Sequence, residues 1–218
     1  MNERSVVIFG GKGTAINVAE QIEDARRRHG HPMRVTGFAI DDPSLGREIA
    51  GFPVVSGVRE AWAKYYDTDV DFIFALYRPD NMQARYAMIA TLGIPASRFA
   101  CFVHPSAYMS SSASVGQGAV VLSNSSVQYR ASIGAFCIVN SNVVVEHEAC
   151  INEGSFLAAG ACVGARARIG TATFIGLNAV IREDVVVGNS AFIGMAATVV
   201  RDVDAGALVF GSPARSPR

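Results

Sequence analysis

A period of six residues runs through this chain without interruption from Val115 to Val199. Every sixth position in this stretch is Val, Ile or Leu, over fifteen consecutive repeats. The residue two places earlier is usually small, as at Ala161, and a glycine often follows, as at Gly116. A sustained period of six is neither helical nor the alternation of a simple strand, and it is typical of a parallel β-helix built from hexapeptides. The alternative, a β-sandwich, requires irregular turns that would break the register.

Composition agrees with a solenoid and excludes several classes of function. Of the 218 residues, 50% are hydrophobic and 17% are charged, which suits coils whose outer faces are partly buried against other subunits. A formal net charge of zero gives no global field to attract nucleic acid or an anionic membrane surface. The chain has no long apolar run and its first residues lack the layout of a signal peptide, so we expect a cytoplasmic protein without a membrane span. The four cysteines lack CxxC spacing, and Cys137 occupies a small-residue position of the repeat, which predicts packing in the core.

The first residues predict the beginning of an α/β domain. An apolar run over 5–9 is followed by Gly10-Gly11-Lys12-Gly13 and then by a helical pattern over 14–29. Backbone N–H groups in such a turn, together with the N-terminus of the helix, can hold a phosphate. The turn lacks both the complete GxGxxG fingerprint and the P-loop pattern, so a plain strand-to-helix turn is an equally open interpretation.

Two aspartates follow the second predicted strand, which spans 34–40. At the carboxyl end of such a strand, Asp41 and Asp42 are placed to accept hydrogen bonds from a nucleotide's ribose or base; a simple turn is the alternative. Further strands are expected at 53–55 and 72–76, and helices at 58–65 and 81–92, after which residues 99–103 lead into the repeat. The sequence therefore predicts a Rossmann-like domain in residues 1–103, a β-helix in residues 104–206 and a tail in residues 207–218.

One histidine stands alone within the repeat. The chain has four histidines, and only His147, in the segment Val145-Glu146-His147-Glu148, lies inside the run of hexads. It follows an inward position by two residues, so its side chain is expected to point away from the coil. Histidine is the usual proton acceptor near neutral pH, which makes His147 a candidate general base.

The chain resembles bacterial hexapeptide-repeat acyltransferases of the NeuD and PglD type, which act on nucleotide-linked sugars. The resemblance rests on the hexads, the α/β beginning and the tail segment Gly-Ser-Pro-Ala-Arg at 211–215. The resemblance covers the whole chain. It implies a left-handed parallel β-helix with three hexads in each coil, a homotrimer with active sites between subunits, and acetyl-CoA bound in the groove between the coils of neighbouring subunits. It also implies that His147 is the base and that Glu148 orients it.

Eighteen residues per coil would stack Ala165 beside His147. The Ala165 N–H could then polarise the thioester carbonyl, a contribution often worth about 3 kcal/mol. The resemblance places the coenzyme against Phe156, Leu177 and Met195. Phe156 stands where many relatives carry a second histidine.

The glycine turn also departs from its relatives. They usually read GxxGHG, whereas this chain has Thr14 and Ala15 in place of the last two residues, and Lys12 is a candidate to compensate by contacting a diphosphate.

These observations lead to one leading hypothesis. The chain is expected to be an acetyl-CoA-dependent N-acetyltransferase acting on a nucleotide-linked 4-amino-4,6-dideoxy sugar. The residues expected to hold the substrate are Lys12, Gly13, Thr14, Asp41 and Asp42. Alternatives are a sugar O-acetyltransferase of the sialic-acid type and a non-catalytic trimer that binds sugar nucleotides. No metal is expected, because a zinc site of the β-helix carbonic anhydrase type needs about three histidines and the repeat has one. The nucleotide, the sugar, the acyl group and the pathway stay open.

Overall fold

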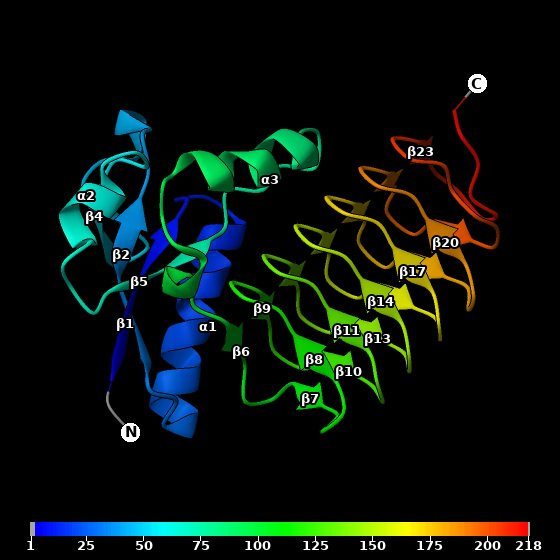
Figure 1. Cartoon of the computed structure of the whole chain (residues 1–218), viewed down its shortest axis with the longest axis horizontal. Helices are drawn as coiled ribbons and strands as arrows, with labels where there is room; N and C mark the ends of the chain where they lie inside the picture. The colour runs from blue at the N-terminus through cyan, green and yellow to red at the C-terminus, as the bar shows by residue number, and fades with distance from the viewer. Residues whose placement is uncertain (1–2, 218) are drawn as a thin grey trace.

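The computed structural model describes residues 3–217 and begins with a five-stranded sheet in the order β3-β4-β2-β1-β5 (Figure 1). Four strands run parallel: β1 (Arg4–Phe9), β2 (Met33–Ala39), β4 (Phe52–Ser56) and β5 (Asp71–Phe74). The edge strand β3 (Glu48–Ile49) pairs antiparallel with β4. The predicted Rossmann-like sheet is confirmed. The short β3 was not predicted, because a two-residue strand carries no periodicity.

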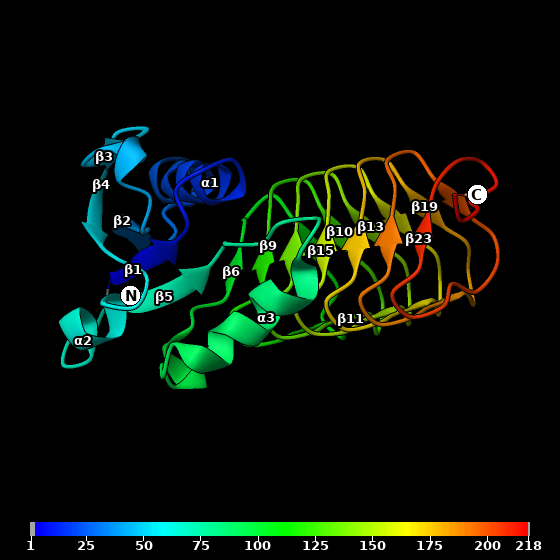
Figure 2. The same ribbon diagram turned by 90° about the horizontal axis from the view of Figure 1, so that it is seen from above.

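Helices cover both faces of this sheet. Helix α1 (Thr14–His29) lies on one face and α2 (Ala61–Tyr65) on the other, whereas α3 (Met82–Thr91) follows β5 and lies alongside the first coils of the solenoid, where Tyr86 faces Phe136 (Figure 2). Two short 3-10 helices span Pro43–Leu45 and Ala96–Arg98. Helix α1 ends at Gly30 in the left-handed conformation, whose N–H bonds the carbonyl of Arg26, so its bounds match those expected from the sequence.

The repeat folds into a left-handed β-helix with three parallel sheets of two-residue strands. The first solenoid sheet contains β6 (Phe102–Val103), β9 (Val120–Val121), β12 (Ile138–Val139), β15 (Phe156–Leu157), β18 (Phe174–Ile175), β21 (Phe192–Ile193) and β23 (Leu208–Val209). The second contains β7 (Tyr108–Met109), β10 (Ser126–Val127), β13 (Val144–Val145), β16 (Cys162–Val163), β19 (Val180–Ile181) and β22 (Thr198–Val199). The third contains β8 (Ser114–Val115), β11 (Ser132–Ile133), β14 (Cys150–Ile151), β17 (Arg168–Ile169) and β20 (Val186–Val187).

The hexad positions fill the interior of the coil as predicted. From Val121 to Val199, each side chain at the sixth position is no more than 2% exposed. Strands pair with the strand one coil away, for example Val145 with Val163, so each coil contains eighteen residues. Cys137 is also fully buried, and this burial raises the pKa of its thiol to about 12.

Glycines occur at two kinds of position in the coils. Every sixth residue from 118 to 196 turns the chain with a positive φ, and most of these positions hold a residue other than glycine. The glycines that follow the inward residues serve another purpose. At Gly170, a Cβ would lie 2.4 Å from the backbone nitrogen of Asn189 in the next coil. These glycines therefore allow neighbouring coils to approach closely.

We expect Gly170→Ala to lower the free energy of unfolding by about 2 to 3 kcal/mol, because the extra methyl group collides with backbone that cannot rotate away. Urea unfolding followed by circular dichroism measures this change. Gly206→Ala is the matched control, since nothing lies within 4 Å of a Cβ placed there and only its φ of 69° opposes alanine, at a cost of about 1 kcal/mol. An equal or larger loss for Gly206→Ala would contradict the close-approach explanation.

The two parts of the chain share one hydrophobic core. Solenoid residues Val120, Leu122 and Ile138 cluster with the buried side chains of the N-terminal sheet. Gln21 of α1 also donates to Ser141 Oγ at 3.0 Å and accepts from the backbone N–H of Ser123. The domain limits at residues 103 and 206 stay a prediction, although β6 already belongs to the first solenoid sheet at Phe102. Within residues 3–217, no helix is long and apolar enough to cross a bilayer.

Candidate active site

The glycine turn lies at the carboxyl end of β1, where the sequence placed a phosphate site. Gly10 has φ 127°, and a Cβ there would lie 2.8 Å from the Cβ of Ala15, so only glycine fits. The N–H groups of Gly11, Lys12 and Gly13 donate no hydrogen bond to another described backbone or side chain. With the positive end of the α1 dipole behind them, these groups are suited to an anion.

The two aspartates after β2 have different roles. Asp41 Oδ1 accepts from the backbone N–H of Val58 at 2.8 Å, which fixes the segment leading to α2. Asp42 faces the glycine turn, where its Oδ2 lies 2.7 Å from Lys12 Nζ. The hydrogen bond from Lys12, with those from Ser44, lowers the pKa of Asp42 to about 2. Asp42 is therefore charged at neutral pH, and it holds Lys12 over the turn.

A cavity of about 310 Å³ opens beside this turn, and we call it the carboxyl-end cavity. Its lining residues are Gly10, Gly11, Lys12, Ile40, Asp42, Ala75, Leu76, Tyr77, Arg78 and Arg85. Three cationic side chains line it against one carboxylate. Arg78 is held by Asp80 through two hydrogen bonds of 3.1 and 2.8 Å. The Nε of Arg85 is buried without a hydrogen-bond partner among the described residues. A cavity of this charge suits a diphosphate.

Sequence reasoning assigned no role to Arg78 or to Arg85. Arg85 lies on α3, more than forty positions after Asp42, and a single arginine on a helix is usually solvated. No local signal marked it, and only the position of α3 at the junction between the sheet and the solenoid brings it to the cavity.

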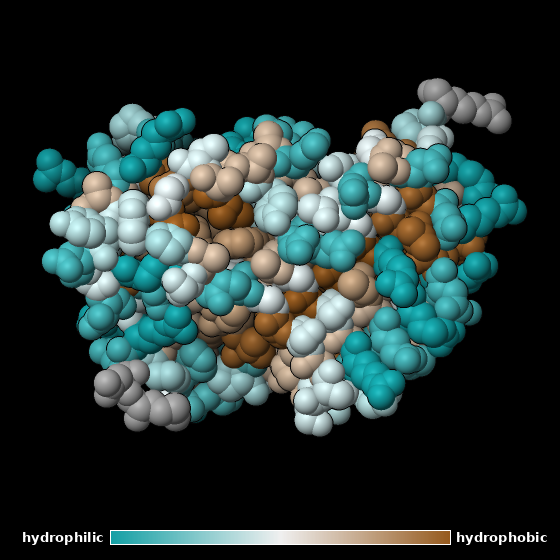
Figure 3. Space-filling model, in the orientation of Figure 1, coloured by the Kyte–Doolittle hydropathy of each residue, from teal (hydrophilic) through white to brown (hydrophobic). Residues whose placement is uncertain are grey.

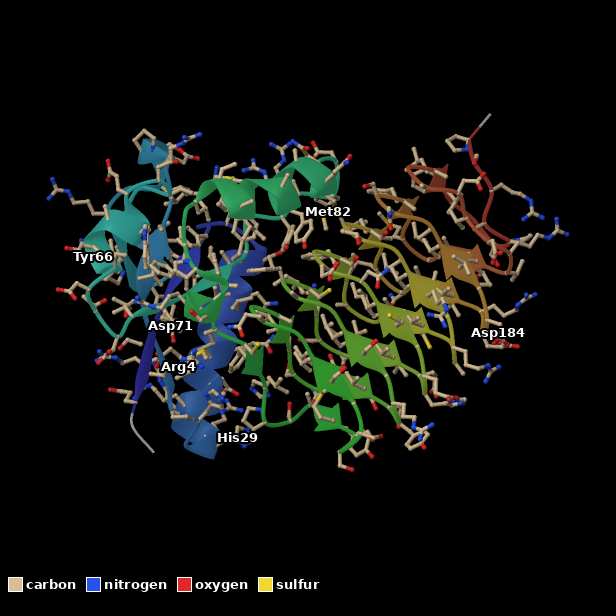
Figure 4. The ribbon with its side chains drawn as sticks, viewed as in Figure 1. Arg4, His29, Tyr66, Asp71, Met82 and Asp184 are labelled. Atoms are coloured by element: carbon tan, nitrogen blue, oxygen red, sulfur yellow. The ribbon has the colours of Figure 1, made fainter. Side chains whose placement is uncertain are left out.

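A second cavity, of about 270 Å³, lies between the N-terminal sheet and the solenoid, and we call it the interdomain cavity. Its lining residues are Thr14, Tyr77, Pro79, Met82, Asn140, Phe156, Ala158, Ala159, Phe174 and Leu177. Figure 4 shows Met82 on α3 where this helix approaches the coils. The structure thus brings together Thr14, expected to contact the substrate, with Phe156 and Leu177, expected to contact the coenzyme.

Tyr77 belongs to both cavities and joins the two domains. Its hydroxyl donates to the carbonyl of Phe136 at 2.8 Å, and its ring lies edge-on to Phe156 at 6.5 Å between centroids. Burial raises the pKa of Tyr77 well above its usual value, so the phenol stays a neutral donor. The carboxyl-end cavity and the interdomain cavity therefore share this wall.

Phe156 is the first member of an aromatic stack along the first solenoid sheet. Ring centroids are 5.5 Å apart between Phe156 and Phe174, 4.9 Å between Phe174 and Phe192, and 5.9 Å between Phe192 and Phe210. Stacking of this kind stabilises neighbouring coils beyond the area buried. Phe156 therefore supplies a rigid apolar wall. The histidine expected at this position from the relatives would supply a polar one.

His147 lies at a different edge of the solenoid, in the turn between β13 and β14. Its Nδ1 lies 3.3 Å from Glu148 Oε2, and their side chains are 44% and 43% exposed. Glu148 has φ 60°, and its N–H is held by the carbonyl of Tyr129 one coil earlier. When Nδ1–H faces the carboxylate, the lone pair of Nε2 is left to accept a proton.

Ala165 stacks beside His147, as the coil length predicted. The N–H of Arg166 donates to the carbonyl of His147 at 3.0 Å, whereas the N–H of Ala165 has no partner among the described residues. A small side chain and an unused amide thus lie one coil further along from His147. The neighbouring Arg166 is paired with Asp184 through bonds of 2.6 and 2.7 Å, and this pairing lowers the pKa of Asp184.

The predicted site is divided within a single chain. Leu177 and Met195 lie in turns of adjacent coils between the first and second solenoid sheets, and they are 49% and 73% exposed. His147 lies between the second and third sheets, so the whole second sheet separates it from the interdomain cavity. One chain therefore holds both halves of the predicted site at two different edges of the solenoid.

No protein-family model matches the sequence, and no curated protein sequence matches it. Solved structures do match. The acetyltransferase domain of PglB from Neisseria gonorrhoeae FA1090, in complex with acetyl coenzyme A, has a TM-score of 0.84 and 27% identity, covering 99% of this chain and 100% of that chain. The predicted resemblance is confirmed.

Two structures from Caulobacter crescentus extend this likeness. PerB in complex with CoA and GDP-perosamine has a TM-score of 0.70 and 26% identity, covering 98% of this chain and 97% of that chain. A variant of perosamine N-acetyltransferase with the same ligands has a TM-score of 0.81 and 24% identity, with the same coverage, and supports the fold. The likeness to these solved structures thus includes both the α/β sheet and the solenoid.

Proposed function

We propose that this chain is an acetyl-CoA-dependent N-acetyltransferase acting on a nucleotide-linked amino sugar, with His147 as the general base. The observation that carries the proposal is the match of this chain, from end to end, to an acetyltransferase domain solved with acetyl coenzyme A. A cationic cavity at the carboxyl end of the sheet suits the diphosphate. The apolar interdomain cavity beside it suits a deoxy sugar, which has few hydroxyl groups to satisfy.

His147 and Ala165 would supply the chemistry. As the amine attacks the thioester carbonyl, Nε2 of His147 accepts the proton that the nitrogen loses while the amide bond forms. The N–H of Ala165 donates to the carbonyl oxygen as it gains negative charge. The C–S bond then breaks, and His147 returns its proton to the departing thiolate. Glu148 favours this sequence because its carboxylate stabilises the imidazolium at Nδ1.

One half-site comprises the two cavities and the other comprises His147 with Ala165. The two half-sites would meet between subunits of a homotrimer. Among the described residues, nine large hydrophobic side chains are exposed, and all except Tyr66 lie on the solenoid: Tyr108, Tyr129, Leu177, Val180, Val186, Met195, Leu208 and Phe210. Figure 3 shows a hydrophobic band along the solenoid face. Such a surface is typical of a protein interface. A neighbouring solenoid packed on it would supply its own His147 to the cavities of the first subunit.

Thiol release from acetyl-CoA tests the proposed activity. Purified protein is incubated with UDP-, GDP- and dTDP-linked 4-amino-4,6-dideoxy sugars, and the free thiol and the N-acetylated product are both measured. We expect release with one nucleotide class and an amide in the product. An ester product would instead establish the sugar O-acetyltransferase alternative. Stoichiometric binding without any thiol release would establish a non-catalytic protein and contradict the proposal.

A further inference from the structure

The interdomain cavity has walls without charge, although the proposed acceptor carries an amino group. Phe156, Phe174 and Leu177 line it from the solenoid, and Pro79 and Met82 line it from the N-terminal domain. Figure 4 shows Met82 at the point where α3 approaches the coils. The rings of Phe156 and Phe174 are stacked with their centroids 5.5 Å apart, which makes the solenoid wall rigid. None of the described residues that line this cavity is acidic or basic.

The polar side chains that line the cavity are also uncharged. The hydroxyl of Tyr77 already donates to the carbonyl of Phe136, and burial raises the pKa of this phenol, so it stays neutral. Asn140 donates through Nδ2 to the carbonyl of Leu157 at 2.9 Å, which leaves its Oδ1 as an acceptor. Thr14 adds one hydroxyl. An amide oxygen and a hydroxyl can replace water around a neutral amine, but neither carries a charge to balance an ammonium ion.

The charged groups next to this cavity are paired with one another. Asp80, in the segment between β5 and α3, holds Arg78 through hydrogen bonds of 3.1 and 2.8 Å. In the adjoining carboxyl-end cavity, Asp42 holds Lys12 at 2.7 Å, and Arg85 adds a further cation. These cations suit the diphosphate of the substrate, and both carboxylates are already paired. Neither carboxylate is therefore left to balance a positive charge in the interdomain cavity.

The neighbouring subunit of the proposed trimer would add His147 and Glu148 to this cavity. Glu148 Oε2 lies 3.3 Å from Nδ1 of the imidazole, whereas the amine would meet Nε2. The ring would therefore stand between the carboxylate and the amine. A neutral imidazole accepts a proton, but it carries no negative charge that could hold an ammonium ion.

We propose that the interdomain cavity binds the amino group of the sugar as the uncharged free base and rejects the ammonium form. Burial without a carboxylate partner destabilises an ammonium ion far more than a neutral amine. The ammonium ion therefore loses one proton to solvent on binding, and His147 accepts only the proton that the nitrogen loses as the amide bond forms. The aromatic wall of Phe156 and Phe174 thus selects the nucleophilic form of the substrate. This inference rests on the proposed function, because it takes the amino sugar as the ligand.

Selection of the free base makes substrate binding depend on pH in a calculable way. An amine beside electron-withdrawing carbons titrates at about pH 8, like the α-amino group of a peptide. Below that pH, each unit lowers the fraction of free base about tenfold, and the Kd of the amino sugar should rise by the same factor. Between pH 8 and pH 6 the expected increase in Kd is about 50-fold, with nearly one proton released for each molecule bound at pH 6.

Two substitutions at one position test the cause. Ala159 lines the cavity and is half-buried, so a side chain added there keeps contact with water. Ala159→Asp adds a carboxylate that can pair with an ammonium ion, and the change in Kd between pH 8 and pH 6 should fall below about fivefold. Ala159→Asn adds a side chain of the same size without charge and should keep the full change. Equal pH dependence in the two variants would contradict the role given to the uncharged wall.

Calorimetric binding to the full-length protein measures these quantities. Each UDP-, GDP- or dTDP-linked 4-amino-4,6-dideoxy sugar is compared with its counterpart in which a C4 hydroxyl replaces the amino group, so that titration of the protein affects both ligands alike. We expect the 50-fold increase in Kd for the amino sugar alone. The same pH dependence for both ligands, or tighter binding of the amino sugar in acid, would overturn this inference and leave the proposed function standing. Binding of neither ligand at any pH would overturn both.

Discussion

Replacing His147 by alanine is expected to lower kcat for acetyl transfer by about 10²- to 10⁴-fold, the usual range for loss of a general base. The side chain is half exposed in a turn and contributes nothing to the core, so the fold and the oligomer should persist. Binding of the nucleotide sugar should also persist, because the cavities that suit it lie at another edge of the solenoid. Thiol release, sedimentation and substrate binding measure these three quantities separately.

Two further variants make this result specific. Glu148→Gln keeps the shape of the partner and removes its charge, so we expect a smaller loss of kcat than for His147→Ala. Glu183→Ala removes an exposed side chain from the same edge two coils further along, and turnover should be unchanged. If His147→Ala retains the parental kcat, His147 is not the base. If Glu183→Ala is equally inactive, substitutions at this edge lower kcat by disturbing the subunit interface, and the loss in His147→Ala does not identify a base.

Mixing two inactive variants is expected to restore activity. One variant carries His147→Ala, and the other carries Arg78→Ala with Arg85→Ala, which removes two cationic side chains from the carboxyl-end cavity. If each site takes its cavities from one subunit and its His147 from the neighbour, random trimers of equal amounts restore about a quarter of the sites. The reason is geometric, because the second solenoid sheet separates His147 from the cavities of its own chain.

The measurement is thiol release by the co-expressed variants, compared with each variant alone and with the unmodified protein. Each variant alone should be inactive at the substrate concentration that gives half-maximal rate in the parent. Recovery to about a quarter of parental activity supports composite sites in a closed ring. Trimers that contain both variants and show no recovery would mean that one chain supplies both half-sites.

The sequence by itself determined the solenoid and the position of the candidate base. The period of six is a local property, because each hexad places one aliphatic residue in the coil interior whatever the rest of the chain does. The same reasoning located Ala165 next to His147, since stacking follows from coil length alone. The limits of α1 were also readable, because a glycine turn precedes it and Gly30 ends it.

Tertiary structure alone decided how these parts meet. Asp41 and Asp42 are neighbours in sequence, yet one fixes Val58 and the other holds Lys12, because their side chains leave the strand end in different directions. Arg85 reaches the carboxyl-end cavity only because α3 docks there. His104 faces Asp24 only because the solenoid begins against the end of α1. Such contacts join residues far apart in the chain, so they depend on how finished elements pack and leave no periodic trace in the sequence.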